Sequence, residues 1–128
     1  MRVLLDTHAL LWAASPVDLL SDRARRLIRS QRNEIFVSAA SAWEIATKYR
    51  LGKLPQAQAL VDDFVSAIQL AGYIALPITL EHALRAGRFP ADHKDPFDRM
   101  LAAQAIHEDL ALISNDEQLD IFGVRREW

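Results

Sequence analysis

Short apolar runs recur along the chain, separated by longer segments with helical periodicity. Four of the runs are almost wholly apolar and do not alternate with polar residues: Val3–Leu5, Ile35–Val37, Tyr73–Leu76 and Leu110–Ile113. An unbroken apolar run is typical of a strand that is buried on both faces, as in a parallel sheet covered by helices. The pattern therefore predicts four buried strands.

The segments between these runs predict helices, with capping residues at their starts and glycines near several of their ends. The expected helices are Ser21 to about Ser30, Ser41 to about Leu51, Ala57–Ala71, Thr79–Ala86 and Pro96–Glu108. Strands that alternate with helices indicate an α/β fold with right-handed crossovers. We expect one domain over residues 1–128, with a mainly parallel central sheet of four to five strands flanked by helices.

Composition narrows the possible chemistry. The 128 residues include no cysteine, which excludes disulfides, thiolate metal sites and cysteine nucleophiles, and which suits a reducing cytoplasm. Asp6 and His8 interrupt the apolar start of the chain, and no run approaches the length of a membrane span. We therefore expect a cytoplasmic protein without a signal peptide or a membrane segment.

Four carboxylates are placed where strands end or helices begin. Asp6 directly follows the first predicted strand, and Asp116 follows the last one after Ser114 and Asn115. Glu44 lies in the first turn of the helix after the second strand, and Asp98 lies in the first turn of the helix that begins at Pro96. In a parallel α/β sheet, the carboxyl ends of the strands share one edge, and ligands bind there. We expect these four side chains to gather at that edge.

Capping is the alternative explanation for each carboxylate taken singly. Ser41 and Glu44 have the spacing of a capping box, and Asp95 with Pro96 reads as an N-cap followed by proline at the first helical position. Together, however, two carboxylates about 4 Å apart repel by about 4 kcal/mol at an effective dielectric constant near 20. A cluster of oxygen ligands without cysteine favours a hard cation, Mg²⁺ or Mn²⁺.

An ordered set of motifs gives the chain a family resemblance. They are Leu5-Asp6-Thr7-His8 with Leu11-Trp12, Ser38-Ala39-Ala40-Ser41-Ala42-Trp43-Glu44-Ile45, Asp95-Pro96-Phe97-Asp98-Arg99 with Ala102-Ala103-Gln104-Ala105, and Ser114-Asn115-Asp116. With these motifs the sequence resembles the PIN-domain ribonucleases, and most closely the VapC toxins of toxin–antitoxin pairs. Ser114 stands where many relatives have threonine, which keeps the hydroxyl group.

The resemblance implies an endoribonuclease that hydrolyses RNA phosphodiesters with water activated by Mg²⁺, for which Mn²⁺ can substitute. It implies catalytic roles for Asp6, Glu44, Asp98 and Asp116, with Asp6, Asp98 and Asp116 as the metal ligands. It also implies a cognate VapB-type antitoxin and a homodimer.

Other residues are candidates for positioning substrate or water. The resemblance implies this role for the hydroxyls of Thr7 and Ser114. Lys48 and Arg99 each lie within about one helical turn of a candidate acid, so we expect them to contact the scissile phosphate. Trp12, Trp43 and Phe97 are expected in the core rather than as platforms that stack on bases. His8 is expected in a packing or hydrogen-bonding role, and His82, His93 and His107 are expected on the surface.

The net charge of −2 conceals an uneven distribution. Residues 20–55 carry eight cations against three acids, whereas residues 54–84 carry no Lys or Arg. This asymmetry predicts a phosphate-binding face, although a solvated helix face is the plainer alternative.

Two other functions fit parts of the pattern. A PIN fold could be retained as a catalytically silent binding module. An Asp-dependent phosphatase would use Asp6 as its nucleophile, but its second aspartate would fall at His8.

Overall fold

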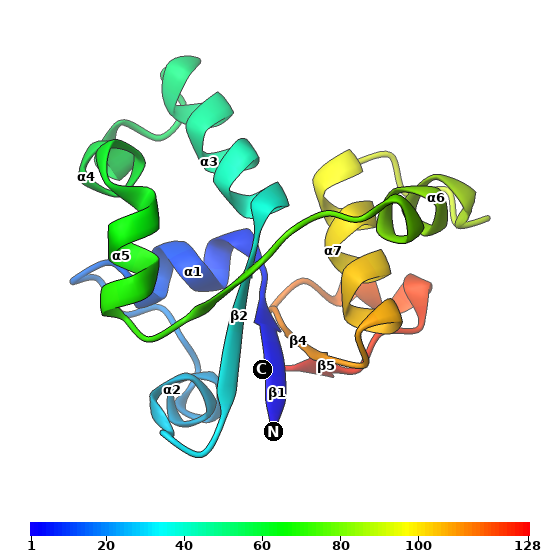
Figure 1. Ribbon diagram of the computed structural model, residues 1–128, viewed down its shortest axis with the longest axis horizontal. Coiled ribbons are helices and arrows are strands. Elements are labelled where there is room, and N and C mark those ends of the chain that lie inside the picture. The colour runs from blue at the N-terminus through cyan, green and yellow to red at the C-terminus, as the bar shows by residue number, and fades with distance from the viewer.

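The protein is built on one central sheet with helices on both faces (Figure 1). The computed structural model describes residues 1–128. Five strands form a single parallel sheet in the order β3-β2-β1-β4-β5: β1 (Arg2–Leu5), β2 (Glu34–Ser38), β3 (Ile74–Leu76), β4 (Ala111–Ile113) and β5 (Arg126–Glu127). The predicted α/β class with a mainly parallel sheet is confirmed.

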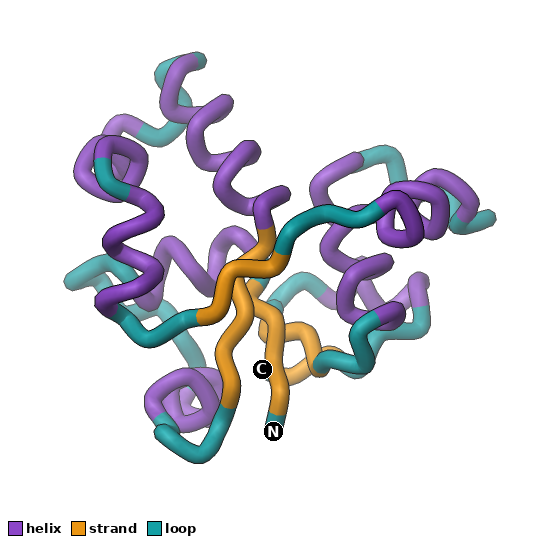
Figure 2. Tube along the Cα trace, viewed as in Figure 1, coloured by secondary structure: helices purple, strands orange, loops and turns teal.

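Seven α-helices and two 3₁₀ helices connect the strands (Figure 2). The α-helices are α1 (Thr7–Ala13), α2 (Asp22–Arg29), α3 (Ala39–Arg50), α4 (Gln58–Asp62), α5 (Phe64–Leu70), α6 (Leu80–Arg88) and α7 (Pro96–His107). The 3₁₀ helices are η1 (Pro55–Ala57) and η2 (Glu117–Phe122). No helix combines the length and the apolar character that crossing a lipid bilayer requires.

The apolar strands β1, β2 and β4 supply two hydrophobic cores, whereas β3, which was also expected to be buried, is an edge strand with Ile74 and Ala75 exposed. Along β1, Val3 and Leu5 face one side of the sheet and pack in a core with residues of α1, α2, α3 and α5. Leu4 faces the other side and packs with α7 and η2. Successive side chains of a strand point to opposite faces, so a strand covered on both sides must be apolar at every position. Burying each such aliphatic side chain contributes roughly 1.5–3 kcal/mol.

Helix α3 starts earlier than its predicted start at Ser41. Its N-cap is Ser38, whose hydroxyl accepts the backbone N–H of Ala40 at 2.9 Å. Ser41 and Glu44 therefore do not form a capping box, and both side chains are buried within the helix. Ser38 and Ser41 are both possible N-cap residues, and α3 is capped by Ser38 because this residue ends β2.

Two other predicted helix limits are wrong. The segment expected as one helix over Ala57–Ala71 is divided at Asp63, whose φ of −144° and ψ of 46° end α4 and begin α5. Gly87 lies inside α6, which continues to Arg88. The short strand β5 was not among the predicted strands, because two polar residues carry no apolar pattern.

Candidate active site

The candidate acids lie at the edge of the sheet where the strands end. Asp6 follows β1, Glu44 lies on α3 directly after β2, and Asp116 follows β4. Asp98 lies in the first turn of α7, whose N-terminal end is at this same edge in Figure 1. The parallel topology is the reason that residues separated by more than one hundred positions share one side of the molecule.

Asp6 is buried and caps α1. Its Oδ1 accepts the backbone N–H of Ala9 at 2.7 Å, and the residue is only 6% exposed. Burial raises the pKa of Asp6 above its usual value, and the charge of Glu44 adds to this rise. The Ser114 hydroxyl and the Ala9 N–H lower the pKa, but they do not outweigh burial. Capping and a site role therefore coexist in one carboxylate.

Glu44 is held by two neighbours, Thr7 and Lys48. The Thr7 hydroxyl donates to Glu44 Oε1 at 2.6 Å and lies 3.1 Å from the Ser41 hydroxyl. The Lys48 ammonium pairs with Glu44 Oε2 from one helical turn away. Thr7 thus ties the residue after Asp6 to Glu44, and it joins α1 to α3 across the mouth of the site.

Asp98 occupies the first turn of α7. Asp95 is the N-cap, and its Oδ1 accepts the N–H groups of Phe97 at 2.9 Å and Asp98 at 3.3 Å. His93 Nε2 lies 2.9 Å from Asp98 Oδ2. Burial raises the pKa of Asp98, as do the nearby charges of Asp95 and Asp116, whereas the hydrogen bond from His93 lowers it. His93 was expected at the surface on the basis of the sequence. It is therefore a residue of the site that sequence reasoning missed.

Ser114 and Asp116 form the turn after β4. The Ser114 hydroxyl is fully buried and accepts the N–H of Asp116 at 3.0 Å. Asp116 Oδ1 accepts the N–H of Gln118 at 3.0 Å and caps η2. Asp116 is more exposed than Asp6, so it lies on the solvent side of the group.

The four carboxylates are neighbours without forming one tight cluster. Asp6 and Glu44 influence each other electrostatically, as do Asp98 and Asp116. No three of the four offer ligand atoms that all lie within 4.8 Å of one another. The four acids thus form two pairs at one edge of the sheet, Asp6 with Glu44 and Asp98 with Asp116.

This donor set fits a divalent cation. The side chains offer only oxygen atoms, which is the chemistry that Mg²⁺ and Mn²⁺ prefer. Burial and neighbouring carboxylates raise the pKa values of Asp6 and Asp98, so the ionised form of each carboxylate is disfavoured in the absence of a cation. Lys48 is the only Lys or Arg that pairs with any of the four acids.

Arg99 does not reach toward the acidic edge as expected. Its guanidinium donates to five backbone carbonyls of residues 86–93, and this uses all of its N–H groups. The expectation that Arg99 contacts a scissile phosphate is therefore corrected, because no donor remains free for it. Lys48 keeps an exposed side, at 36% of its side-chain surface.

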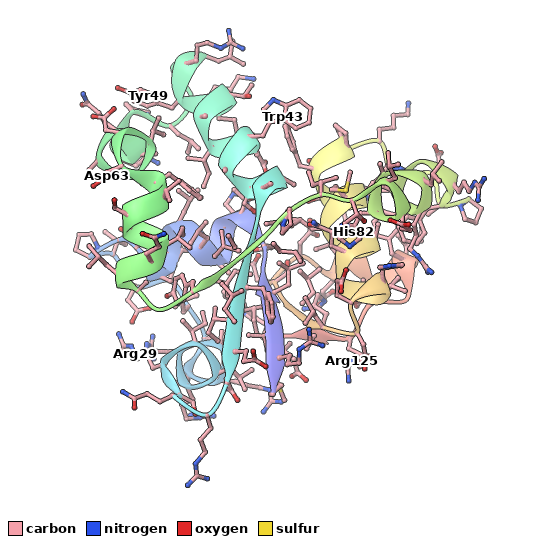
Figure 3. All side chains as sticks on the ribbon, in the orientation of Figure 1. Arg29, Trp43, Tyr49, Asp63, His82 and Arg125 are labelled. Atoms are coloured by element: carbon pink, nitrogen blue, oxygen red, sulfur yellow. The ribbon has the colours of Figure 1, made fainter.

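Two further expectations about single residues are wrong. Trp43 was expected in the core but is 62% exposed, with only an edge contact to Phe97 at 4.9 Å between ring centroids. Figure 3 shows the labelled Trp43 side chain reaching from α3 toward the start of α7. His82 was expected at the surface but is completely buried. Trp43 precedes the buried Glu44 in α3, and successive residues of a helix point in different directions, so its side chain lies on the outer side of the helix.

The cations of residues 20–55 do not form one face. Helix α2 lies beside the amino ends of the strands, away from the acids, as the label of Arg29 shows in Figure 3. Two of its arginines are already paired, Arg23 with Glu127 and Arg25 with Asp18 and Asp22. Arg50 and Lys53, at the far end of α3, are separated from this group. The predicted single phosphate-binding face is thus divided between two regions.

A second group of potential metal ligands lies away from the acids, at the C-terminal end of α7. It consists of His82, His107 and Glu108. His82 Nδ1 accepts the N–H of Thr79 at 3.0 Å, so its proton is on Nε2, which lies 2.8 Å from Glu108 Oε1. This proton occupies the position that a metal would need, and the contact is a structural hydrogen bond that fixes α6 to α7.

Comparison with known proteins places this arrangement among relatives. The chain is 39% identical over 67 residues to Ribonuclease VapC16 of Mycobacterium tuberculosis, across 52% of this chain and 46% of that protein. The match takes in about half the length of this curated relative.

Solved structures share the fold over nearly the whole chain. VapBC2 from Rickettsia felis bound to a promoter DNA fragment has a TM-score of 0.69 at 20% identity, covering 100% of this chain and 99% of that one. FitAcB from Neisseria gonorrhoeae has a TM-score of 0.66 at 19% identity, covering 98% and 96%. VapBC-1 from nontypeable Haemophilus influenzae has a TM-score of 0.60 at 15% identity, covering 99% and 97%.

A match to the PIN domain extends over residues 3–124, which include all four candidate acids. The chain therefore belongs to the PIN-domain family.

Proposed function

We propose that this protein is a VapC-type ribonuclease toxin that uses Mg²⁺, or Mn²⁺ in its place, to hydrolyse RNA phosphodiesters. The observation that carries the proposal is that the buried Asp6 and the half-buried Asp98 both lie at one edge of a parallel sheet, with pKa values raised by burial. Keeping ionised carboxylates buried is costly, and a bound cation offsets that cost. The curated relative, which carries the name ribonuclease, supports the same chemistry.

In this proposal, Asp6, Asp98 and Asp116 would hold the ion, and their side chains would close in on it from the separated pairs in which they lie without it. A bound Mg²⁺ neutralises charge that develops on the phosphate and lowers the pKa of water. Glu44 orients the attacking water, since Thr7 and Lys48 fix both of its carboxylate oxygens. The Ser114 hydroxyl forms a hydrogen bond with the Asp6 carboxylate and accepts the backbone N–H of Asp116, so it fixes both residues relative to β4.

The rim of the site supplies surface for a single strand of RNA. The exposed indole of Trp43 lies one residue from Glu44 and contacts Phe97, which adjoins Asp98. Aromatic faces of this kind stack on unpaired bases, which contributes roughly 1–3 kcal/mol per base. Trp43 is therefore assigned to substrate binding, with the exposed side of Lys48 nearest the phosphate.

We further propose that a VapB-type antitoxin binds the protein and that the toxin forms a homodimer in the cytoplasm. The names of similar solved structures, which describe VapBC complexes, support an antitoxin partner. Such a partner would control access to the acidic edge.

The test is cleavage of RNA by the purified protein, freed of any antitoxin, with Mg²⁺ or Mn²⁺. We expect Asp6→Asn and Asp98→Asn each to lower the rate by at least about 100-fold, because each removes charge stabilisation from the reacting centre. Asp62→Asn is the matched control, since Asp62 is exposed on α4 and has no partner.

The same experiment separates the catalytic proposal from a silent binding module. A silent module would bind RNA without cutting it under either metal. Equal cleavage by the wild type and both site variants would place the activity elsewhere and would overturn the proposal.

A further inference from the structure

The guanidinium of Arg99 organises the backbone that connects α6 to α7. Each of its five N–H groups has a carbonyl acceptor, with Nε, Nη1 and Nη2 all engaged. The acceptors and distances are Ala86 at 2.9 Å, Gly87 at 3.4 Å, Phe89 at 2.7 Å, Ala91 at 3.0 Å and His93 at 3.0 Å. One side chain thus bonds to five backbone carbonyls between the end of α6 and the start of α7.

These carbonyls have few other partners available. Ala86 and Gly87 lie in the last turn of α6, where the carbonyls have no N–H donor from within the helix. Phe89, Ala91 and His93 lie in the segment between α6 and α7, which contains no helix or strand. Their carbonyls turn inward at every second residue, so the segment wraps around the guanidinium.

His93 is the last residue held in this way, and its side chain enters the acidic site. Its Nε2 lies 2.9 Å from Asp98 Oδ2, and its ring packs edge-on against Phe122 at 5.3 Å between centroids. The side chain is only 13% exposed. The backbone carbonyl of His93 is therefore fixed by Arg99 while its ring is fixed by Phe122 and Asp98.

We propose that Arg99 and His93 are positioning residues of the acidic site. Arg99 winds residues 86–93 so that His93 reaches Asp98, and His93 holds one Asp98 oxygen so that the other is presented to the cation. The His93 half of this inference rests on the proposed metal-dependent function, whereas the Arg99 half concerns the folding of the segment alone.

The chemistry explains why arginine stands at this position. Lysine carries three donors on a single nitrogen, and it cannot meet five carbonyls spread along the segment. Arg99→Lys keeps the charge and most of the length while removing the fork. It is therefore the variant that separates geometry from charge.

The first test needs no metal. Amide hydrogen exchange is measured in the metal-free, full-length protein with Arg99→Lys, with Arg88→Lys as the control. Arg88 is exposed in the same region and has no side-chain hydrogen bond. We expect Arg99→Lys to lose protection by at least about 10-fold at residues 87–89, whose N–H groups donate within the last turn of α6, while β1 and β4 stay protected, because local opening is independent of the core.

Protection at residues 87–89 equal to that of wild type would overturn the role of Arg99. Loss of protection in β1 and β4 as well would show a general defect in folding, which contradicts a role confined to this segment. Arg88→Lys is expected to match wild type in both regions.

The second test is calorimetric binding of Mn²⁺ to His93→Leu and His93→Gln. Removing a hydrogen-bond partner of a metal ligand lowers metal affinity by about 10–100-fold, so we expect this loss in His93→Leu. The glutamine amide places an N–H donor near the position of His93 Nε2, so His93→Gln is expected to restore binding. His107→Leu, at the opposite end of α7, is expected to bind as wild type.

The outcomes separate this inference from the proposed function. If the wild type neither binds Mn²⁺ nor cleaves RNA, the proposed function fails and the role of His93 fails with it, but the exchange result for Arg99 is unaffected. If the wild type binds Mn²⁺ and His93→Leu binds equally well, the role of His93 is overturned while the proposed function stands.

Discussion

At the residue scale, two opposing demands meet in the Asp6 carboxylate. Its Oδ1 stabilises the first turn of α1 through the Ala9 N–H, while burial raises its pKa. At the start of α7 two residues divide these demands, because Asp95 caps the helix while burial raises the pKa of Asp98. The local structure of each helix thus places a carboxylate where its charge is hard to maintain without a cation.

This placement predicts how the stability of the metal-free protein depends on pH. The native pKa of Asp6 is raised, so the native state holds this proton more tightly than the unfolded chain does. The unfavourable contribution is complete above the native pKa. It is relieved as the pH falls from there toward the usual value of 3.8.

Asp6→Asn should remove this penalty, because an amide oxygen still accepts the Ala9 N–H. In EDTA at about pH 7 we expect the variant to melt higher than wild type, and to gain less stability on acidification, by thermal unfolding. Adding Mg²⁺ should raise the Tm of wild type but not of the variant.

Asp18→Asn is the control of opposite sign. The Arg25 guanidinium holds the pKa of Asp18 below its usual value, so this charge favours folding and its removal should lower the Tm slightly. A lower Tm for Asp6→Asn in EDTA would contradict the interpretation of Asp6.

At the element scale, α7 is the helix that closes the site. Asp98, Ala102 and Ala105 lie on one stripe, and both alanines are buried against the sheet in the core that contains Leu4. Small side chains allow the helix to approach the sheet closely, and this brings Asp98 to the edge beside Asp6. The stripe therefore links core packing to the geometry of the site.

Enlarging this stripe should separate the helix from the sheet. Ala102→Leu adds atoms to a position with no exposed surface, and we expect it to destabilise the protein by about 1–3 kcal/mol in urea unfolding. RNA cleavage should fall further than the remaining folded fraction explains, since Asp98 moves with the helix.

Ala83→Leu is the matched substitution, because Ala83 is exposed on the neighbouring α6. It should change neither stability nor cleavage appreciably. If Ala102→Leu left both at wild-type values, close packing of α7 would not be what places Asp98.

At the scale of the whole molecule, charge is distributed between two edges. The unpaired arginines of α2 and the following turn, Arg26, Arg29 and Arg32, lie away from the acids, whereas Arg50 and Lys53 extend from α3 on the side of the acidic edge. A near-neutral chain can therefore bind RNA at one edge while its other cations serve another purpose.

The dependence of RNA affinity on salt should tell these two groups apart. Each phosphate contact to a single strand contributes about 0.7 to the slope of log K against log salt concentration. We expect Arg50→Gln with Lys53→Gln to reduce the slope, and Arg26→Gln with Arg29→Gln to leave it unchanged. Binding measured by fluorescence anisotropy with inactive Asp98→Asn protein avoids cleavage during the titration.

The opposite pattern, with the slope reduced only by the α2 substitutions, would place the RNA across the amino ends of the strands. That result would be inconsistent with the proposed path of the substrate past Trp43 and Lys48.

The sequence by itself determined the features that depend on local periodicity. Apolar runs locate the buried strands because a strand covered on both faces has no polar position to spare. The placement of Asp6 directly after β1 and of Asp116 in the turn after β4 follows from the same pattern, as does the N-cap formed by Asp95 before Pro96. The shared edge then follows from parallel topology.

Only the tertiary structure decided which side chains meet across the chain. It committed Arg99 to backbone carbonyls, brought His93 to Asp98, buried His82 and left Trp43 exposed. It also separated the cations of α2 from Arg50 and Lys53, although the sequence places all of them within residues 20–55. The physical reason is that hydrogen-bond partners and burial depend on how the loops and helices pack around the sheet, and the periodicity of a single segment does not encode that packing.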